Sequence, residues 1–438
     1  MKTRLTACLL AAIVLSTAIT GCAPTGDGSA AAIVQVEERP LLTVTPGEQN
    51  PTARTAAQGA NDFAFRLSAA LAQEAGEESF VVSPYSVWLP LAALLNATDE
   101  ANQEALLAVL GASGITAADV NQAASRMLFD LTNEGEREFA EEFDFPHHSP
   151  LRIANAIFVS DQVSLRRDFA QTFADYYRGS AFEVDFLSQE AVDAINQWAY
   201  DHTEGLITDL VEEFDPDTVA AIANAIYFSD QWSREFNPAD TSEGIFHSPA
   251  GELPAYFMHS LNDWQFYYED EILQATRLGF ATGGGMFILL PHSGDATALL
   301  SDMTAEYFDH IQNNGSHGTV QLQLPRFSVE STFNDLCDVL IRLGVPLFDE
   351  QSAPLTGGLI YDNLRVWLSE AMQKAVIEVD EEGTTAAAVT VLVAVAESAP
   401  DYQEPFVMIC DRPFVFVLYQ RTNDGARQVL FTGVLNQP

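Results

Sequence analysis

The chain is poor in basic residues. Its 438 residues include 20 Lys and Arg against 62 Asp and Glu, which gives a formal net charge of −42. Loss of residues 1–21 would remove Lys2 and Arg4 and no acid, so the remaining charge would be −44, with Lys374 as the only lysine. Nucleic-acid binding depends on basic contacts to phosphate, so this composition excludes it as a partner. The same shortage argues against a heparin-type cofactor.

Cysteine is also scarce. Of the four cysteines, Cys8 lies in the apolar N-terminal stretch and Cys22 follows it, which leaves Cys337 and Cys410 in the body of the chain. These two could pair, but two buried free thiols are the expectation for so large a fold. We predict no disulfide framework, no metal site and no cofactor.

The common catalytic motifs are missing. The sequence contains no G-x-S-x-G nucleophile motif, no H-E-x-x-H zinc motif and no glycine-rich phosphate loop. His147-His148 and the stretch 315–318 are interpreted as polar loop residues. The chain is therefore not expected to be an enzyme.

Residues 1–21 are predicted to be a lipoprotein signal peptide. Lys2 and Arg4 precede the uncharged stretch 5–20, and Ile19-Thr20-Gly21-Cys22 resembles a lipobox, in which Cys22 becomes the acylated first residue. The apolar core is too short for a permanent spanning helix. An extracytoplasmic protein held to a membrane by lipid is expected, and a plain secretory signal is the alternative.

Residues 22–58, rich in Ala, Gly, Pro, Thr and Glu, are predicted to be a flexible tether to one domain at 59–438. Helices come first and strands dominate the second half, which favours an α+β fold. Predicted helices, with their end signals, are 61–75, one opened by Ser83-Pro84, 99–110 ending at Gly111, one capped by Ser188, and 331–343 ending at Gly344. Predicted strands are 286–290, 320–324, 376–379, 414–418 and 429–434.

Two segments are nearly identical. Residues 153–162 read IANAIFVSDQ and residues 222–231 read IANAIYFSDQ. Two copies are too few for a solenoid. We predict equivalent strands of one sheet, each leaving through the same Ser-Asp-Gln turn.

The segment 378–400 is the most informative. Glu381, Glu382 and Gly383 open a thirteen-residue run, 384–396, with no charge, proline or glycine. Its small and β-branched residues suit a buried strand, but an ordinary strand has roughly 5–6 residues. A polar, proline-containing stretch follows it. The simple interpretation is that residues 384–396 form a long interior strand or, less readily, an Ala-rich buried helix. The other interpretation is that they form a loop that can also become a strand.

The second reading is favoured by a resemblance to the serpins, protease inhibitors that insert such a loop into a sheet. The resemblance runs from about residue 60 to the C-terminus. It rests on Ser83-Pro-Tyr-Ser, on Asn224-Ala-Ile-Tyr-Phe followed by Trp232, on Leu324-Pro-Arg-Phe, on Arg412-Pro-Phe-Val-Phe and Leu430-Phe-Thr-Gly, and on the Glu382-Gly-Thr hinge. It implies the serpin fold: helices around a large central mixed sheet, two smaller sheets and an exposed reactive-centre loop.

The resemblance also implies roles for individual residues. Ser83, Ser86 and Asn224 match the polar shutter beneath the point where the sheet opens, and Trp232 matches the breach where the loop enters. The hinge comprises Glu381, Glu382, Gly383, Thr384, Thr385, Ala386, Ala387 and Ala388. Gln373 replaces the family's shutter histidine; it can still form hydrogen bonds, but a pH switch based on that histidine cannot be carried over to this chain.

The implied function is that of a monomeric suicide-substrate inhibitor of a serine protease, trapped as a covalent acyl complex. The family's usual interval places the reactive bond at Glu397–Ser398, which suits a glutamate-preferring protease. Cleavage after Ala396 by an elastase- or subtilisin-like enzyme, and a cysteine protease, are the alternatives. A non-inhibitory binding protein of the same fold is the competing reading, although such proteins often carry bulky, charged or proline residues in the hinge.

Overall fold

A computed structural model describes residues 31–33, 51–132, 151–203, 205, 207–215, 218–333, 336–348, 355, 357–360, 367–368, 370–384, 404–423 and 425–438. Four sets of predicted site residues lie outside these ranges: Cys22, Thr385 to Ala388, Glu397 and Ser398. Within the described ranges, no helix has an apolar stretch long enough to cross a bilayer.

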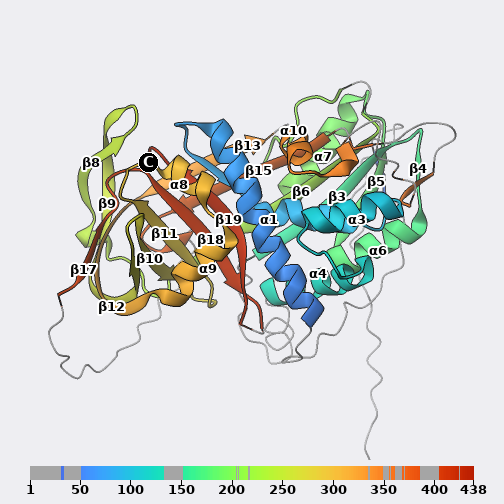
Figure 1. Cartoon of the computed structure of the whole chain (residues 1–438). Helices are drawn as coiled ribbons and strands as arrows, with labels where there is room; N and C mark the ends of the chain where they lie inside the picture. Colours follow the sequence, from blue (N-terminus) through green and yellow to red (C-terminus); the bar gives the residue numbers. More distant parts are fainter. Residues whose placement is uncertain are drawn as a thin grey trace, which may run out of the picture.

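A six-stranded mixed sheet forms one part of the molecule (Figure 1). Its order is β1 (Ala31–Ile33), β5 (Gly179–Val184), β3 (Leu151–Ser160), β6 (Ala220–Phe228), β15 (Glu370–Val379) and β13 (Phe327–Phe333). Strands β3 and β5 are parallel, as are β6 and β15, whereas β3–β6 and β13–β15 are antiparallel. This is the mixed central sheet that the sequence predicts.

A second, nine-stranded sheet contains the other predicted strands. Its order is β17 (Phe406–Ile409), β12 (Ser316–Pro325), β9 (Gly251–Glu269), β10 (Leu273–Gly279), β11 (Gly285–Pro291), β18 (Phe414–Arg421), β19 (Arg427–Leu435) and β2 (Phe80–Val82), with β8 (Ser242–Ser248) paired to β9. Strand β9 has 19 residues. Its first part pairs with β8 and its last part with β10, so it joins these strands into one continuous sheet. In Figure 1, β8, β9, β12 and β17 lie at the opposite end of the molecule from β3 and β5.

Helices cover both faces of the central sheet. The described helices are α1 (Pro51–Ala75), α2 (Pro84–Leu94), α3 (Glu100–Val109), α4 (Ala117–Leu131), α6 (Arg167–Tyr177), α7 (Gln189–His202), α8 (Ala296–Asp302), α9 (Ala305–Asn314) and α10 (Cys337–Arg342), with short 3₁₀ turns at Pro238–Asp240 and Pro346–Phe348. Helix α8 packs on β11, β18 and β19 of the second sheet. Ile195 and Trp198 of α7 pack on alternate residues of β3 and β6. The other residues of these strands face the main core with α2.

Four of the predicted helix ends are confirmed. The Asp99 side chain accepts a hydrogen bond from the amide of Asn102, and the Ser188 side chain accepts one from Ala191. Gly111 and Gly344 have φ values of 68° and 92°, the left-handed conformation that favours glycine after a helix.

The predicted tether was wrong in two places. Residues 31–33 pair with β5 as an edge strand, and α1 begins at Pro51 rather than near residue 61. Small residues, which composition alone assigns to a linker, here allow close packing. A Cβ on Gly59 would lie 2.5 Å from the carbonyl oxygen of Gly111.

The predicted helix over 331–343 was also wrong in its first half. Residues up to Phe333 belong to β13, and the helix begins only at Cys337. Buried Phe327 and Val329 alternate with exposed residues, a period of two that extends the strand into the segment read as helical.

Candidate functional site

The two near-identical segments lie side by side in the central sheet. Strands β3 and β6 pair with Asn155 opposite Asn224, as predicted for equivalent strands. Their exits differ, however, so the prediction of one shared turn was wrong. Asp161 and Gln162 form a turn after β3, whereas Asp230–Gln231 form the short strand β7 after β6.

A seam opens between β6 and β15. The ladder between these parallel strands contains the pairs Ala221–Glu370, Ile222–Ala371 and Ala223–Met372. Beyond these pairs the two strands separate. The rest of β6, Asn224–Phe228, pairs only with β3, and the rest of β15, Gln373–Val379, pairs only with β13, among the described strands. Among the residues that the structure describes, each strand therefore has no pairing partner on the side that faces the seam, and an unpaired backbone edge can accept an added strand.

The hinge residues enter the top of this seam. After β15 the chain turns back, and β16 (Gly383–Thr384) pairs antiparallel with β7, with Gly383 opposite Gln231 and Thr384 opposite Asp230. The Thr384 side chain is 1% exposed. A Cβ on Gly383 would lie 2.2 Å from the Asp230 carbonyl oxygen, so glycine is required for this close approach.

Trp232 fixes the turn from which the hinge emerges. Its backbone amide donates to the Glu382 carbonyl and its indole Nε1 donates to the Asp380 carbonyl, each at 2.9 Å. The indole stacks on Phe280 with ring centroids 4.9 Å apart. The structure thus places Trp232 against the hinge.

An ion pair anchors the first hinge residue. Arg326 Nε lies 2.9 and 2.8 Å from the two carboxylate oxygens of Glu381, Arg326 Nη2 lies 2.6 Å from Oε1, and Thr241 also donates to Glu381. The Glu381 side chain is 6% exposed. Burial opposes its ionisation, but the bonds from Arg326 and Thr241 outweigh it and hold the pKa of Glu381 below its ordinary value. Arg326 belongs to the Leu324-Pro-Arg-Phe motif, whose partner the sequence could not name.

We expect Glu381→Gln to lower the free energy of unfolding at pH 7 by about 1–3 kcal/mol, because it removes charge-assisted bonds. A carboxylate whose pKa falls on folding contributes stability that is present above its unfolded pKa, about 4.3, and lost as pH falls through the folded pKa. The difference between wild type and variant should therefore shrink below about pH 4. Chemical denaturation across pH measures this, with Glu382→Gln as the control. An equal effect of Glu382→Gln would contradict the assignment.

A polar cluster closes the lower end of the seam. Gln373 Oε1 accepts from the Ser83 amide at 3.0 Å, and Gln373 Nε2 donates to the Ser83 carbonyl at 2.8 Å and to Ser86 Oγ. Ser83 precedes α2 as predicted, but its hydroxyl donates to the Leu430 carbonyl at 2.7 Å instead of capping the helix. Gln373 thus joins β15 to α2 through a fully bonded amide.

Asn224 belongs to a separate pair. Its Nδ2 donates to Asn155 Oδ1 at 2.7 Å, and Asn155 Nδ2 donates to the Tyr177 carbonyl at 2.7 Å. The prediction missed Asn155, although it occupies the same position in the repeated segment as Asn224. Both side chains are buried.

Lys374 holds the strands to the segment that follows α7. Its Nζ lies 2.7 Å from Asp209 Oδ1 and 2.8 Å from Glu330 Oε1 on β13. Burial disfavours the charge, yet these two bonds raise the pKa of Lys374. The only lysine outside the predicted leader therefore ties β15 to elements on both sides.

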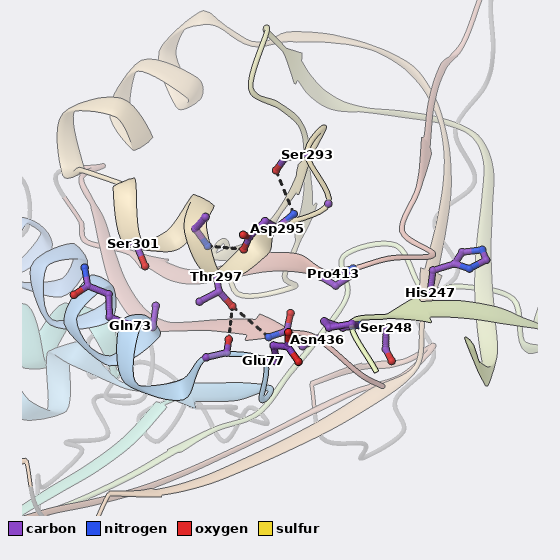
Figure 2. A pocket seen from close by; sticks show the side chains of 15 residues that line it. Gln73, Glu77, His247, Ser248, Ser293, Asp295, Thr297, Ser301, Pro413 and Asn436 are labelled. Carbon is purple, nitrogen blue, oxygen red and sulfur yellow. Dashed lines mark hydrogen bonds between the residues drawn. The ribbon is translucent and has the colours of Figure 1, made fainter. Parts of the chain in front are cut away.

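A pocket of about 610 Å³ lies elsewhere, between α1, α8 and the end of the chain (Figure 2). Thr297 Oγ1 donates to the Gly76 carbonyl at 2.8 Å and accepts from Asn436 Nδ2 at 3.3 Å, while Asp295 caps α8 at Ala298. Its polar groups bond one another, so we interpret it as a junction between elements.

Within the ranges that the structure describes, neither Cys337 nor Cys410 forms a disulfide, and both are buried, as expected. Burial raises the pKa of the Cys410 thiol. A buried thiol kept protonated is a poor nucleophile, so Cys410 is a core residue.

A central sheet that separates between two parallel strands, with a glycine hinge at the opening, is the arrangement that the resemblance to the serpins implies. The model of the family described as "Serpin (serine protease inhibitor)" matches residues 58–438. The chain belongs to the serpin family, whose members are generally serine protease inhibitors.

Relatives and solved structures agree. An uncharacterised serpin-like protein of Thermococcus kodakarensis is 31% identical over 387 residues, covering 86% of this chain and 84% of that protein. Alpha-1-antiproteinase of Callosciurus caniceps is 30% identical, covering 89% and 90%. The crystal structure of tengpin, a thermophilic serpin, in the native state is 25% identical with a TM-score of 0.77, covering 90% and 96%. Human thyroxine-binding globulin, 22% identical with a TM-score of 0.75 and covering 88% and 99%, shares the fold.

Proposed function

We propose that this serpin is a suicide-substrate inhibitor of a serine protease and inserts its own loop into the seam between β6 and β15. The observation that carries this is the pairing of Gly383 and Thr384 with β7 at the mouth of the seam. The pairing is antiparallel, so the chain enters in the direction that a strand between parallel β6 and β15 would need.

The residues after Thr384 suit such a strand. Every second residue of this segment is small or apolar, and none is charged. These residues are Thr384, Ala386, Ala388, Thr390, Leu392, Ala394 and Ala396. A charge there would cost several kcal/mol on burial, and a proline would delete a ladder hydrogen bond. At ~3.3 Å per residue, inserting thirteen residues would move the end of the loop by roughly 40–45 Å, enough to drag an attached enzyme.

We place the reactive bond at Glu397–Ser398. The protease nucleophile would attack the Glu397 carbonyl, forming an ester, and the amine of Ser398 would leave with the proton from the enzyme's general acid. Insertion then competes with hydrolysis of that ester. The neighbouring bond after Ala396, cleaved by an elastase- or subtilisin-like enzyme, and attack by a cysteine protease remain the alternatives.

We further propose that Cys22 is acylated and anchors the inhibitor outside the cytoplasm. Support comes from the lipobox-like sequence at 19–22 and its position directly after an apolar stretch. Mass spectrometry of the mature N-terminus tests it. An unmodified N-terminus elsewhere than residue 22 would indicate a secreted protein.

The test of function uses residues 31–438 mixed with glutamate-, alanine- and arginine-preferring serine proteases. We expect a complex that survives a denaturing gel and a released C-terminal peptide that begins at Ser398. A peptide that begins at Glu397 would move the bond to Ala396–Glu397. Cleavage without any complex would overturn the inhibitory function and favour a binding protein.

A further inference from the structure

Strands β12 and β17 form an uncharged border of the second sheet. The ten residues of β12 and the four of β17 include no Asp, Glu, Lys or Arg, although these residues make up 19% of the chain. Among the described strands, β17 pairs only with β12, at the end of the molecule that also carries β8 and β9 (Figure 1). Proteins usually guard an outer strand with charged side chains, so the absence of charge here calls for an explanation.

Large apolar side chains lie on the outward face of this border. Val407 and Ile409 are 46% and 43% exposed, and Trp264 of β9 is 62% exposed. Val407 pairs with Gln321 and Trp264 pairs with Thr319, two residues earlier in β12, so these side chains share one face of the sheet. Trp264, Val407 and Ile409 are called the apolar strip below.

The opposite face of the same strands is ordinary core. Val320, Leu322 and Met408 belong to the main hydrophobic core. The strands therefore have apolar residues on both faces, although only one face is covered by the rest of the described chain. A strand whose outer face is exposed to water normally carries polar residues there.

A β-bulge brings Trp264 to the outward face. Leu322 lies opposite Ser260, but Thr319, three residues earlier, lies opposite Trp264, four residues later, so β9 has one extra residue in between. Ser260 is buried. Regular alternation from Ser260 would place Trp264 on the buried face as well, and the extra residue moves it to the outside.

The apolar strip lies where a protease bound to the loop must come. Strand β17 is the first described strand after the loop, and eight residues separate Glu397 from Phe406. Such a segment spans at most roughly 30 Å. A domain of ~200 residues has a radius of gyration of about 16 Å and is thus roughly 40 Å across. A protease that holds the proposed reactive bond is therefore large enough to cover the strip.

Other occupants fit the strip less well. A second copy of this chain would bring two net charges of −42 together, and an anionic membrane would repel the chain in the same way. A protease has no such constraint on its charge. Interfaces between proteins are depleted of charge at their centres and enriched in tryptophan, which is the composition of the strip.

We propose that the apolar strip is a docking surface for the target protease, separate from the reactive loop, and that an apolar patch of the protease packs on Trp264, Val407 and Ile409. This role rests on the proposed inhibitory function. The contact acts before the loop is cut, so it raises the rate of capture and leaves the fate of the acyl complex unchanged.

The test compares the wild type with Trp264→Thr, Val407→Thr and the double variant, each as the full chain. Threonine suits a strand and removes apolar surface. Leu187→Thr is the matched control, because Leu187 is 70% exposed and follows β5 at the other end of the molecule. The readout is the second-order rate constant for cleavage of the loop by the glutamate- or alanine-preferring protease, and guanidinium midpoints check the fold.

We expect Trp264→Thr to lower this rate constant at least about tenfold, and the double variant to lower it further. Leu187→Thr should retain the wild-type rate constant. The ratio of complex to cleaved inhibitor should be the same in all variants, because it is decided after cleavage. The midpoints should also be unchanged, because the substituted side chains are exposed.

The possible failures are distinguishable. Equal cleavage rates in the wild type and the strip variants would overturn the docking surface, as would an equal loss in Leu187→Thr, while a covalent complex would still support inhibition. Cleavage without any complex would overturn the inhibitory function, and the cleavage rates would still decide on the strip. A wild type that sediments as a dimer, with a monomeric Trp264→Thr, would assign the strip to a second copy instead.

Discussion

Thr384→Arg is expected to convert the inhibitor into a substrate. Thr384 is buried against β7 at the mouth of the seam, so an arginine there would have to carry its charge into the core before the rest of the loop could follow. Burying an unpaired charge costs several kcal/mol, and each 1.4 kcal/mol added to the insertion barrier slows it about tenfold. Hydrolysis of the ester should then win, and the yield of covalent complex per cleaved loop should fall at least tenfold.

The measurement is the ratio of complex to cleaved inhibitor on a denaturing gel. Thr385→Arg is the matched control, because the next residue of a strand points to the opposite face. Undiminished complex formation by Thr384→Arg would contradict insertion through this opening.

Cleavage within the loop is expected to raise the thermal stability of the wild type. The inserted strand would pair with the free edges of β6 and β15 and fill the seam between them. The hydrogen bonds that the strand would gain on both edges, together with burial of its small and apolar side chains, should raise Tm by at least about 10 °C.

Calorimetry of the intact and cleaved proteins measures this. Thr384→Arg, cleaved in the same way, is the control and should gain less. A wild type whose Tm does not change on cleavage would point to a serpin that does not insert its loop.

The sequence predicted the hinge, with the help of the family resemblance, because its signal is local. The signal consists of Gly383 and the run that follows it, which has no charge and no proline. These features can be recognised in one short segment without knowing the fold. The repeated segments likewise predicted equivalent strands of one sheet, because equal patterns suit equal surroundings; that the two strands are neighbours came from the structure. Composition misled at residues 51–58, where three alanines and two threonines suggest a linker in isolation but form the first turns of a helix in the folded chain.

Contacts between distant segments were decided only by the tertiary structure. Arg326 and Glu381 are 55 residues apart, and Ser83 and Gln373 are 290 apart, so no local pattern could pair them. No local pattern could predict the seam either, because it exists where β6 and β15 separate after three residue pairs. Nor could it show that Asn224 Oδ1 accepts no hydrogen bond among the described residues. The sequence predicts which segment has the composition of an inserted strand, because side-chain size and charge are local properties. The fold decided where that strand can go, because an open backbone edge depends on how distant strands pair.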